Sequence, residues 1–154
     1  QGDDRMICNQ TALLHEAPIA EMIDHKAREH GVSYGLSEAG YDIRIKQELF
    51  LSEDARFALA STIERFQMPK TLVGVVHDKS TWARRGLSVF NTVIEPGWNG
   101  WLTLELVYHG YGTLHIPAGA GIAQVLFNHL EWPADYGDGK YQNQENEPVG
   151  PITA

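Results

Sequence analysis

After Gly31 the chain is a series of short runs of branched and aromatic residues, separated by Gly, Pro, Asn and Asp. The runs are YDIRIKQELFL, RFALAST, TLVGVV, LSVFNTVI, GWLTLELVYH, GTLHIP and IAQVLFNHLEW. Many short strands with frequent turn signals are typical of an antiparallel sandwich or barrel. The sequence therefore predicts a mainly β protein. Its 154 residues, of which 43% are hydrophobic, are the size of one ordinary domain.

The preceding segment, NQTALLHEAPIAEMIDHKAREHG, predicts one or two short helices. Asn9 or Thr11 can cap the first helix. Pro18 is expected to break the segment in two, and Gly31 can end it.

Two terminal segments are expected to flank a β domain of residues 6–132. Residues 1–5 precede the first methionine and are interpreted as a leader or an expression remnant. Residues 133–154 are rich in Gly, Pro, Asn and Asp and have almost no apolar side chains. This composition predicts a flexible C-terminal arm or lid that orders when it binds a ligand.

Composition excludes several classes of protein. The formal net charge of −8 argues against nucleic-acid partners, which require a basic surface. The only cysteine is Cys8, so we expect no intrachain disulfide and no thiolate-rich zinc site, as in a reducing cytoplasm. No apolar run approaches the roughly 18 residues of a membrane span, and no secretory signal is recognisable.

The histidines do not form a recognisable metal-binding pattern. None of the seven fits H-E-x-x-H or another paired-ligand spacing. The zinc deaminase signature H-x-E followed by P-C-x-x-C is absent, and no G-x-S-x-G motif indicates a serine nucleophile. Scattered surface or core histidines are the better interpretation.

The stretch GWNGWLTLELVYHG alternates as a β-strand with a leucine-rich core face. Glu105 lies on the opposite face, between a threonine and a valine. It either belongs to a solvated outer face, which antiparallel sheets commonly have, or is a catalytic carboxylate on a rigid strand.

The stretch HDKSTWARRGL groups Lys79, Arg84 and Arg85 around the hydroxyls of Ser80 and Thr81. Such cations and hydroxyls bind phosphate oxygens through charge-assisted hydrogen bonds. A solvated basic turn is the alternative.

Two further stretches carry polar groups in turns. VIEPGWNG presents Glu95 and Trp98, the latter expected at the surface, and fits either a sugar-binding turn or a plain hairpin. GKYQNQ places Lys140, Tyr141 and Gln144 in the C-terminal arm, as a lid for an anionic ligand would require.

In chain order, these stretches resemble the dCTP deaminase and dUTPase superfamily, and its dCTP deaminase branch more closely. The matching stretches are MICNQTALL, SEAGYDIRI, RFALASTIERFQMP, DKSTWARRGL, VIEPGWNGWLTLEL, AGAGIAQVLF and YGDGKYQNQ. The resemblance implies a distorted jelly-roll or β-barrel fold of the dUTPase type. It also implies a homotrimer with active sites between subunits, and Mg²⁺ carried by the nucleotide triphosphate, without zinc.

The resemblance also implies roles for individual residues. Glu105 occupies the position of the general acid and base, Ser80 that of the serine that holds the attacking water, and Arg84 that of an orienting arginine. A carboxylate desolvated in a pocket has a raised pKa, which suits a group that both accepts and donates protons. The implied substrate-binding residues are Lys79, Thr81, Glu95, Trp98, Gln124, Tyr136, Lys140 and Gln144.

The chain departs from the family pattern at four places, one of which is the tail between Tyr136 and Lys140, which is short. Lys79 stands where arginine is commoner, and Glu95 where aspartate is usual. The segment between Gly86 and Glu95 is shorter than in the best-known deaminases and contains Asn91 and Thr92 instead of a Thr-Ala pair. This segment shapes the wall near the reacting amino group, so base selection is the least determined property.

Three alternatives stay open from the sequence. A dUTPase would use a carboxylate at the Glu95 position, but glutamate moves the group out by one methylene, and Glu105 is not typical of dUTPases. A bifunctional deaminase and dUTPase would use both acids. A non-catalytic nucleotide-binding trimer would keep the basic cluster but tolerate the loss of Glu105.

Overall fold

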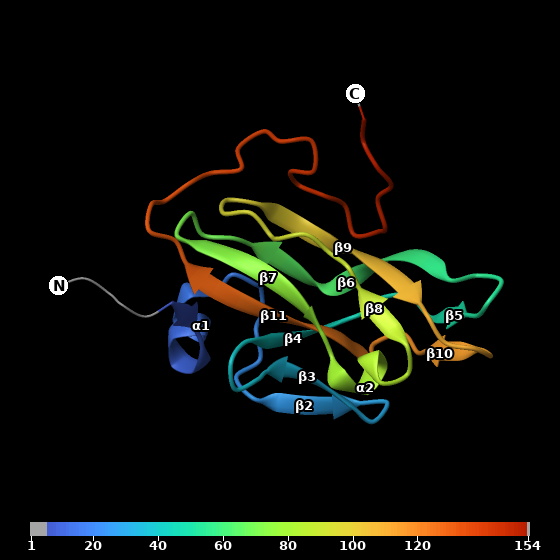
Figure 1. Cartoon of the computed structure of the whole chain (residues 1–154). Coiled ribbons are helices and arrows are strands. Elements are labelled where there is room, and N and C mark those ends of the chain that lie inside the picture. The colour runs from blue at the N-terminus through green and yellow to red at the C-terminus, as the bar shows by residue number, and fades with distance from the viewer. Residues whose placement is uncertain (1–5, 154) are drawn as a thin grey trace.

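The computed structural model describes residues 6–153. The predicted leader or remnant, residues 1–5, lies outside the described residues. Two antiparallel sheets pack face to face, and a small strand pair closes one end (Figure 1). The first sheet has the order β1 (Ile7–Cys8), β11 (Gly121–His129), β4 (Tyr41–Arg44), β3 (Val32–Leu36) and β2 (Lys26–Glu29).

β7 (Leu72–Asp78) pairs with the edge of β11 opposite to β4 and β1. The second sheet has the order β6 (Phe57–Gln67), β9 (Asn99–Tyr108) and β8 (Leu87–Val89). The small pair consists of β5 (Leu49–Leu51) and β10 (Leu114–Ile116). This architecture confirms the predicted mainly β fold.

The core lies between the two sheets, where the alternating faces of their strands meet. β9 contributes Leu104 and Leu106, and β11 contributes Val125 and Phe127, all without solvent exposure. Each such side chain stabilises the fold by roughly 1.5–3 kcal/mol relative to an exposed position. The predicted leucine-rich core face of the long strand is therefore confirmed at its centre.

The N-terminal region contains one helix, α1 (Gln10–Glu16), and not a helical segment that continues to Gly31. The helix ends where Ala17 adopts a left-handed conformation directly before Pro18. Residues 26–29 have good helix propensity but form the strand β2, because a two-residue turn connects them to β3 and the two strands pair. Both turn residues, His30 and Gly31, have positive φ, as a type I′ hairpin turn requires. Gly31 therefore belongs to a hairpin turn and does not end a helix. Pairing between the strands outweighs the local helix propensity.

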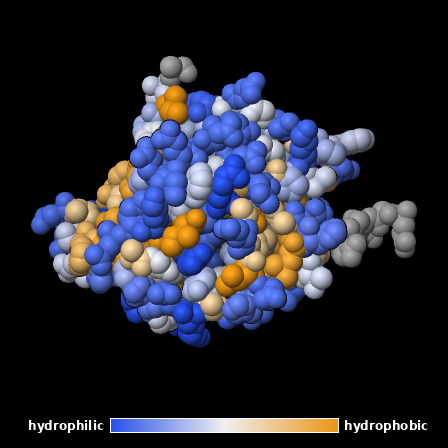
Figure 2. Space-filling view, turned by 180° about the vertical axis from the view of Figure 1, so that it is seen from behind, coloured by the Kyte–Doolittle hydropathy of each residue, from blue (hydrophilic) through white to orange (hydrophobic). Residues whose placement is uncertain are grey.

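The face of the molecule seen in Figure 2 is mostly hydrophilic. Figure 2, which shows the face opposite to that of Figure 1, has hydrophobic residues in small patches among hydrophilic ones. Within the described part of the chain, no helix combines the length and the apolar character of a membrane span.

Candidate active site

A cavity of about 750 Å³ lies beside β9, and Glu105 is among the residues that line it. Leu59 of β6 pairs with Glu105 in register, and Leu59 also lines the cavity. The other walls come from the loop between β8 and β9 and from the C-terminal segment. A single chain therefore encloses the predicted catalytic carboxylate in a space large enough for a small molecule.

Glu105 is held by the middle of β9, so its backbone is fixed by pairing on both sides. β6 pairs with one edge of β9, and the chain that follows β8 bonds to the other edge. Burial raises the pKa of the Glu105 carboxyl above its ordinary value, which is the direction predicted for a proton shuttle. Among the residues described, this carboxylate takes part in no ion pair, so desolvation alone determines the shift.

The loop between β8 and β9 brings Glu95 and Trp98 to the same cavity. Glu95 is exposed, whereas Trp98 is only 6% exposed. The indole N–H of Trp98 donates to the carbonyl of Tyr141 at 2.6 Å, and its ring lies 6.1 Å from that of Phe66. The expectation of a surface tryptophan is therefore wrong, because the C-terminal segment covers the ring.

The C-terminal segment, red in Figure 1, passes over β9 and is anchored there. The Gln144 side-chain amide donates to the carbonyl of Trp101 and to Oγ1 of Thr103, at 2.8 and 2.6 Å. The backbone N–H of Val149 donates to the same Thr103 hydroxyl oxygen at 3.1 Å. Tyr136 joins the segment to the loop through a bond from its N–H to the carbonyl of Pro96.

Hydrogen bonds to β9 and its preceding loop hold the C-terminal segment in the structure, and its flexibility and its ordering by a ligand stay predictions. Tyr136 and Gln144 do line the cavity, as substrate-binding residues would. Lys140 does not line it, and its ammonium lies 5.4 Å from the ring centre of Tyr141. Motion of the segment as a lid stays a prediction.

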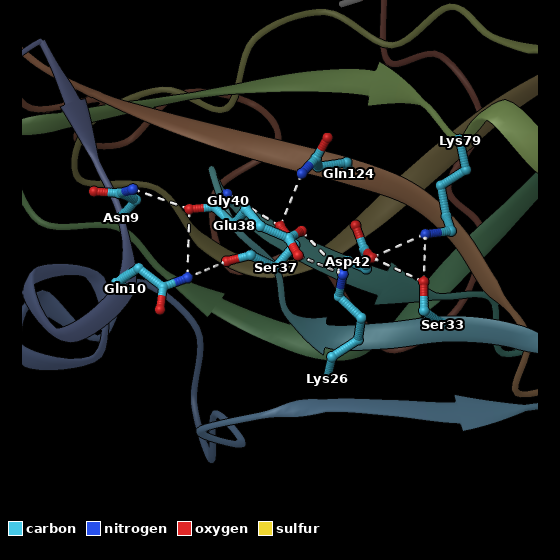
Figure 3. A network of polar contacts seen from close by, with 10 residues as sticks. All are labelled: Asn9, Gln10, Lys26, Ser33, Ser37, Glu38, Gly40, Asp42, Lys79 and Gln124. Carbon is cyan, nitrogen blue, oxygen red and sulfur yellow. Dashed lines mark hydrogen bonds and ion pairs between the residues drawn. The ribbon is translucent and has the colours of Figure 1, made fainter.

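Lys79 belongs to a second polar group, at the end of β7 (Figure 3). Its ammonium contacts Oδ2 of Asp42 at 2.9 Å and Oγ of Ser33 at 3.1 Å. The side chains of Lys79 and Asp42 are 11% and 6% exposed. A buried carboxylate thus neutralises this predicted phosphate ligand and fixes its position.

Ser80, Thr81 and Arg84 follow Lys79 on and after a short helix, α2 (Ser80–Ala83). All three are exposed. The buried Trp82 fixes the helix, since its indole N–H donates to the carbonyl of Gly121 at the start of β11. The basic stretch therefore forms a short helix held on the first sheet, and its role in binding phosphate stays a prediction.

Gln124 of β11 completes this second group. Its side-chain amide donates to Oγ of Ser37 at 2.8 Å, and Gln10 of α1 donates to the carbonyl of Ser37 (Figure 3). The Ser37 hydroxyl, in the turn that follows β3, thereby orients the Gln124 amide, and α1 holds that turn through Gln10.

The predicted site residues therefore form two groups within one chain. Residues that line the cavity include the carboxylates of Glu95 and Glu105, and among the described residues neither Lys nor Arg lines it. The cationic and hydroxyl groups of Lys79, Ser80, Thr81 and Arg84 lie instead at α2 and the adjacent end of β7, and Lys140 of the C-terminal segment belongs to neither group. Within residues 6–153, no three His, Cys, Asp or Glu side chains are placed to hold a metal ion.

Sequence reasoning missed several residues that line the cavity, namely Phe57, Leu59, Leu102, Thr103, Val149 and Pro151. Thr103 could have been found, since it shares the strand face of Glu105. The others depend on the register of β6 and on the path of the C-terminal segment, which no local pattern indicates.

Solved structures with a similar fold are dUTPases. One is the EIAV dUTPase, with a TM-score of 0.54 and 20% identity over 80% of this chain and 95% of that one. Another is a mutant dUTPase of Staphylococcus bacteriophage 80alpha with dUpNHpp, with a TM-score of 0.57 and 19% identity over 71% and 85%. A mutant dUTPase of S. aureus phage phi11, described with a structural Mg(II) ion, has a TM-score of 0.56 and 19% identity over 76% and 90%. At sequence identities of 19–20%, the structural similarity shows that the chain shares the fold of these proteins.

The sequence defines the family. The model of the dCTP deaminase-like family matches residues 42–130, which is more than half of the chain. A dCTP deaminase of Sulfurovum sp. is 36% identical over 85% of this chain and 87% of its own length. One of Acidobacterium capsulatum is 33% identical over 92% and 93%, and one of Campylobacter fetus is 38% identical over 74% and 78%. The chain belongs to the dCTP deaminase-like family.

Proposed function

We propose that this protein hydrolyses the amino group of dCTP, giving dUTP and ammonia. The observation that carries the proposal is the position of Glu105, a strand carboxylate partly buried in a cavity with a raised pKa. Family membership supports the same activity, since the named relatives are dCTP deaminases.

In this mechanism Glu105 removes a proton from water, and the resulting hydroxide adds to C4 of the cytosine ring. Glu105 then delivers the proton to the ring nitrogen N3. A second transfer, from the new hydroxyl group to the amino group, releases ammonia and leaves the carbonyl of uracil. The sum is dCTP and water giving dUTP and ammonia. A positioned acid and base contributes about 10²- to 10⁴-fold to such a rate.

The proposal includes a homotrimer in which each active site lies between two subunits. Glu105, Glu95, Trp98, Tyr136 and Gln144 would come from one subunit. A neighbouring subunit would supply Ser80 to hold the water, Arg84 to orient the catalytic groups, and Lys79, Thr81 and Gln124 to bind the nucleotide. The separation of these two groups within one chain supports this arrangement, because a dNTP needs cations and none of the described Lys and Arg residues lines the cavity of one chain.

The arrangement has no need of a zinc ion, since carboxylate chemistry activates the water. The described residues offer no three-ligand cluster, so we propose that Mg²⁺ arrives bound to the triphosphate, whose charge it partly neutralises. The protein's part is to bind the phosphates through Lys79, Thr81 and Lys140. A cytoplasmic location stays a prediction.

The test is to incubate the purified protein with Mg²⁺ and either dCTP or dUTP, and to measure ammonia and pyrophosphate in parallel. Ammonia from dCTP without pyrophosphate is the expected result. Pyrophosphate from dUTP alone would overturn the proposal and move the chemistry to Glu95.

A bifunctional enzyme is the second candidate, because Glu95 and Glu105 line the same cavity. It would release both products from dCTP, and Glu95→Ala would abolish the pyrophosphate while ammonia release, with a raised KM for dCTP, would persist. A non-catalytic nucleotide-binding trimer would release neither product while still binding dCTP.

A further inference from the structure

The pairing of β9 with β8 ends just before Glu105. β8 pairs with β9 in register from Leu87 and Tyr108 to Val89 and Leu106. One more backbone bond follows, from the N–H of Phe90 to the carbonyl of Glu105 at 3.1 Å. Beyond this point the chain leaves β9 to form the cavity wall.

The side chain of Asn91 continues the pairing where the backbone stops. Its Nδ2 donates to the carbonyl of Thr103 at 2.7 Å, and its Oδ1 accepts from the N–H of Glu105 at 2.8 Å. One primary amide thus satisfies the acceptor and the donor that a neighbouring strand would otherwise satisfy. The Thr103 carbonyl can only accept and the Glu105 N–H can only donate. These two contacts therefore also determine which amide position of Asn91 holds the nitrogen and which holds the oxygen.

This contact joins two parts of the cavity lining. Asn91, Thr92 and Glu95 come from the loop before β9, and Thr103 and Glu105 come from β9 itself. The bond from the Glu105 N–H to Asn91 and the bond from the Phe90 N–H to the Glu105 carbonyl flank the Cα from which the Glu105 side chain leaves β9. Displacement of that backbone moves the carboxylate relative to the loop residues that line the same cavity.

We infer that Asn91 is a positioning residue for Glu105, fixing the catalytic carboxylate relative to the wall that receives the base. The inference rests on the proposed deaminase function. Only asparagine fits the position, because aspartate presents a second acceptor to the Thr103 carbonyl and alanine bonds to neither group. A misplacement of about 1 Å in such a site costs about 100-fold in rate.

The test compares Asn91→Ala and Asn91→Asp with wild type in the ammonia assay. We expect kcat to fall by about 10- to 100-fold with a KM changed by less than about threefold, because the interaction orients a catalytic group and does not bind substrate. A matched control is Gln67→Ala, which removes an exposed side-chain amide that donates to the carbonyl of Ala17. It should leave kcat unchanged.

Hydrogen exchange at the Glu105 amide, measured by NMR, reports on the same contact without any activity. Asn91→Ala should accelerate this exchange, while Asn91→Asp, which keeps the acceptor, should accelerate it less. A kcat of Asn91→Ala within twofold of wild type, or a rise in KM alone, would overturn the inference. If wild type releases no ammonia, the proposed function fails and with it the catalytic role of Asn91. Unchanged exchange would show instead that the contact itself does not hold in solution.

Discussion

At the scale of single residues, one strand position determines the chemistry proposed for this chain. Glu105 shares β9 with Leu104 and Leu106, which are fully buried on the opposite face. Its carboxyl faces the cavity, where desolvation favours the protonated form. The same burial that prepares the group for proton transfer therefore makes its ionised form unfavourable to the folded state.

The Glu105→Gln variant should separate these two effects. We expect activity to fall by about 10²- to 10⁴-fold. Because the pKa of Glu105 is raised in the folded state, its contribution to stability falls as pH rises from its unfolded value, about 4.3, through its folded value. The variant should therefore have the higher free energy of unfolding at pH 7, and the difference should vanish below about pH 4.

Urea denaturation of both proteins at pH 4 and pH 7 measures this difference. Greater stability of wild type at pH 7 would contradict the prediction. Full activity in Glu105→Gln would show that another group is the acid and base.

At the scale of secondary-structure elements, an ion pair joins the two sheets. Arg44 of β4 donates from its backbone N–H and from Nε to the two carboxylate oxygens of Glu64 in β6, at 2.9 and 2.8 Å. The Glu64 side chain is 3% exposed. Glu64 lies where the register of β6 against β9 shifts. The ion pair therefore stabilises an irregularity in β6, the strand that pairs with the strand of Glu105.

Arg44→Ala should lower the free energy of unfolding by about 3–5 kcal/mol, because it leaves a buried carboxylate without its partner. Guanidinium chloride denaturation measures the change. Lys26→Ala removes the exposed pair with Glu38 and is the matched control, with little expected effect. Adding Glu64→Leu to Arg44→Ala should restore part of the loss. Equal effects of the two single substitutions would contradict this account.

The elements also show how far the sequence determines the structure. Alternation and turn residues predict β4 to β11 in their correct order, because each strand has a local hydrophobic pattern. β2 could not be predicted, since Lys26 and its neighbours favour a helix and only pairing with β3 makes them a strand. The path of the C-terminal segment depends on Thr103, whose hydroxyl attracts two distant partners. Such contacts leave no trace in a local pattern.

At the scale of the whole molecule, the residues of the candidate site lie in two separate groups, one at the cavity beside β9 and one at α2. The family resemblance identifies residues from both groups, but it cannot say which of them one chain brings together. Within residues 6–153, no Lys or Arg lines the cavity of Glu105, and Arg84 is exposed at the end of α2. Two surfaces of the same chain thus carry complementary parts of one proposed site, which a closed cyclic assembly can unite.

Complementation tests this division. Glu105→Gln and Arg84→Ala should each be nearly inactive, because each removes one part of every site. Co-expression of the two variants should restore about a quarter of wild-type activity, since random mixing in a cyclic trimer leaves that share of sites with both residues intact. Light scattering should give the mass of a trimer. A monomer, or no recovery on mixing, would contradict the shared site.

The Asn91 contact has an evolutionary consequence. Its amide completes the edge of β9 next to Glu105, so in the pairing described Thr92 and Val93 form no backbone hydrogen bond with the strand, whereas Ile94, which follows them, pairs with Gly74 of β7. Insertions, deletions and exchanges can accumulate at residues 92 and 93 while the strand keeps its geometry. The wall that meets the base can thus diverge among relatives without altering the residue that transfers the proton.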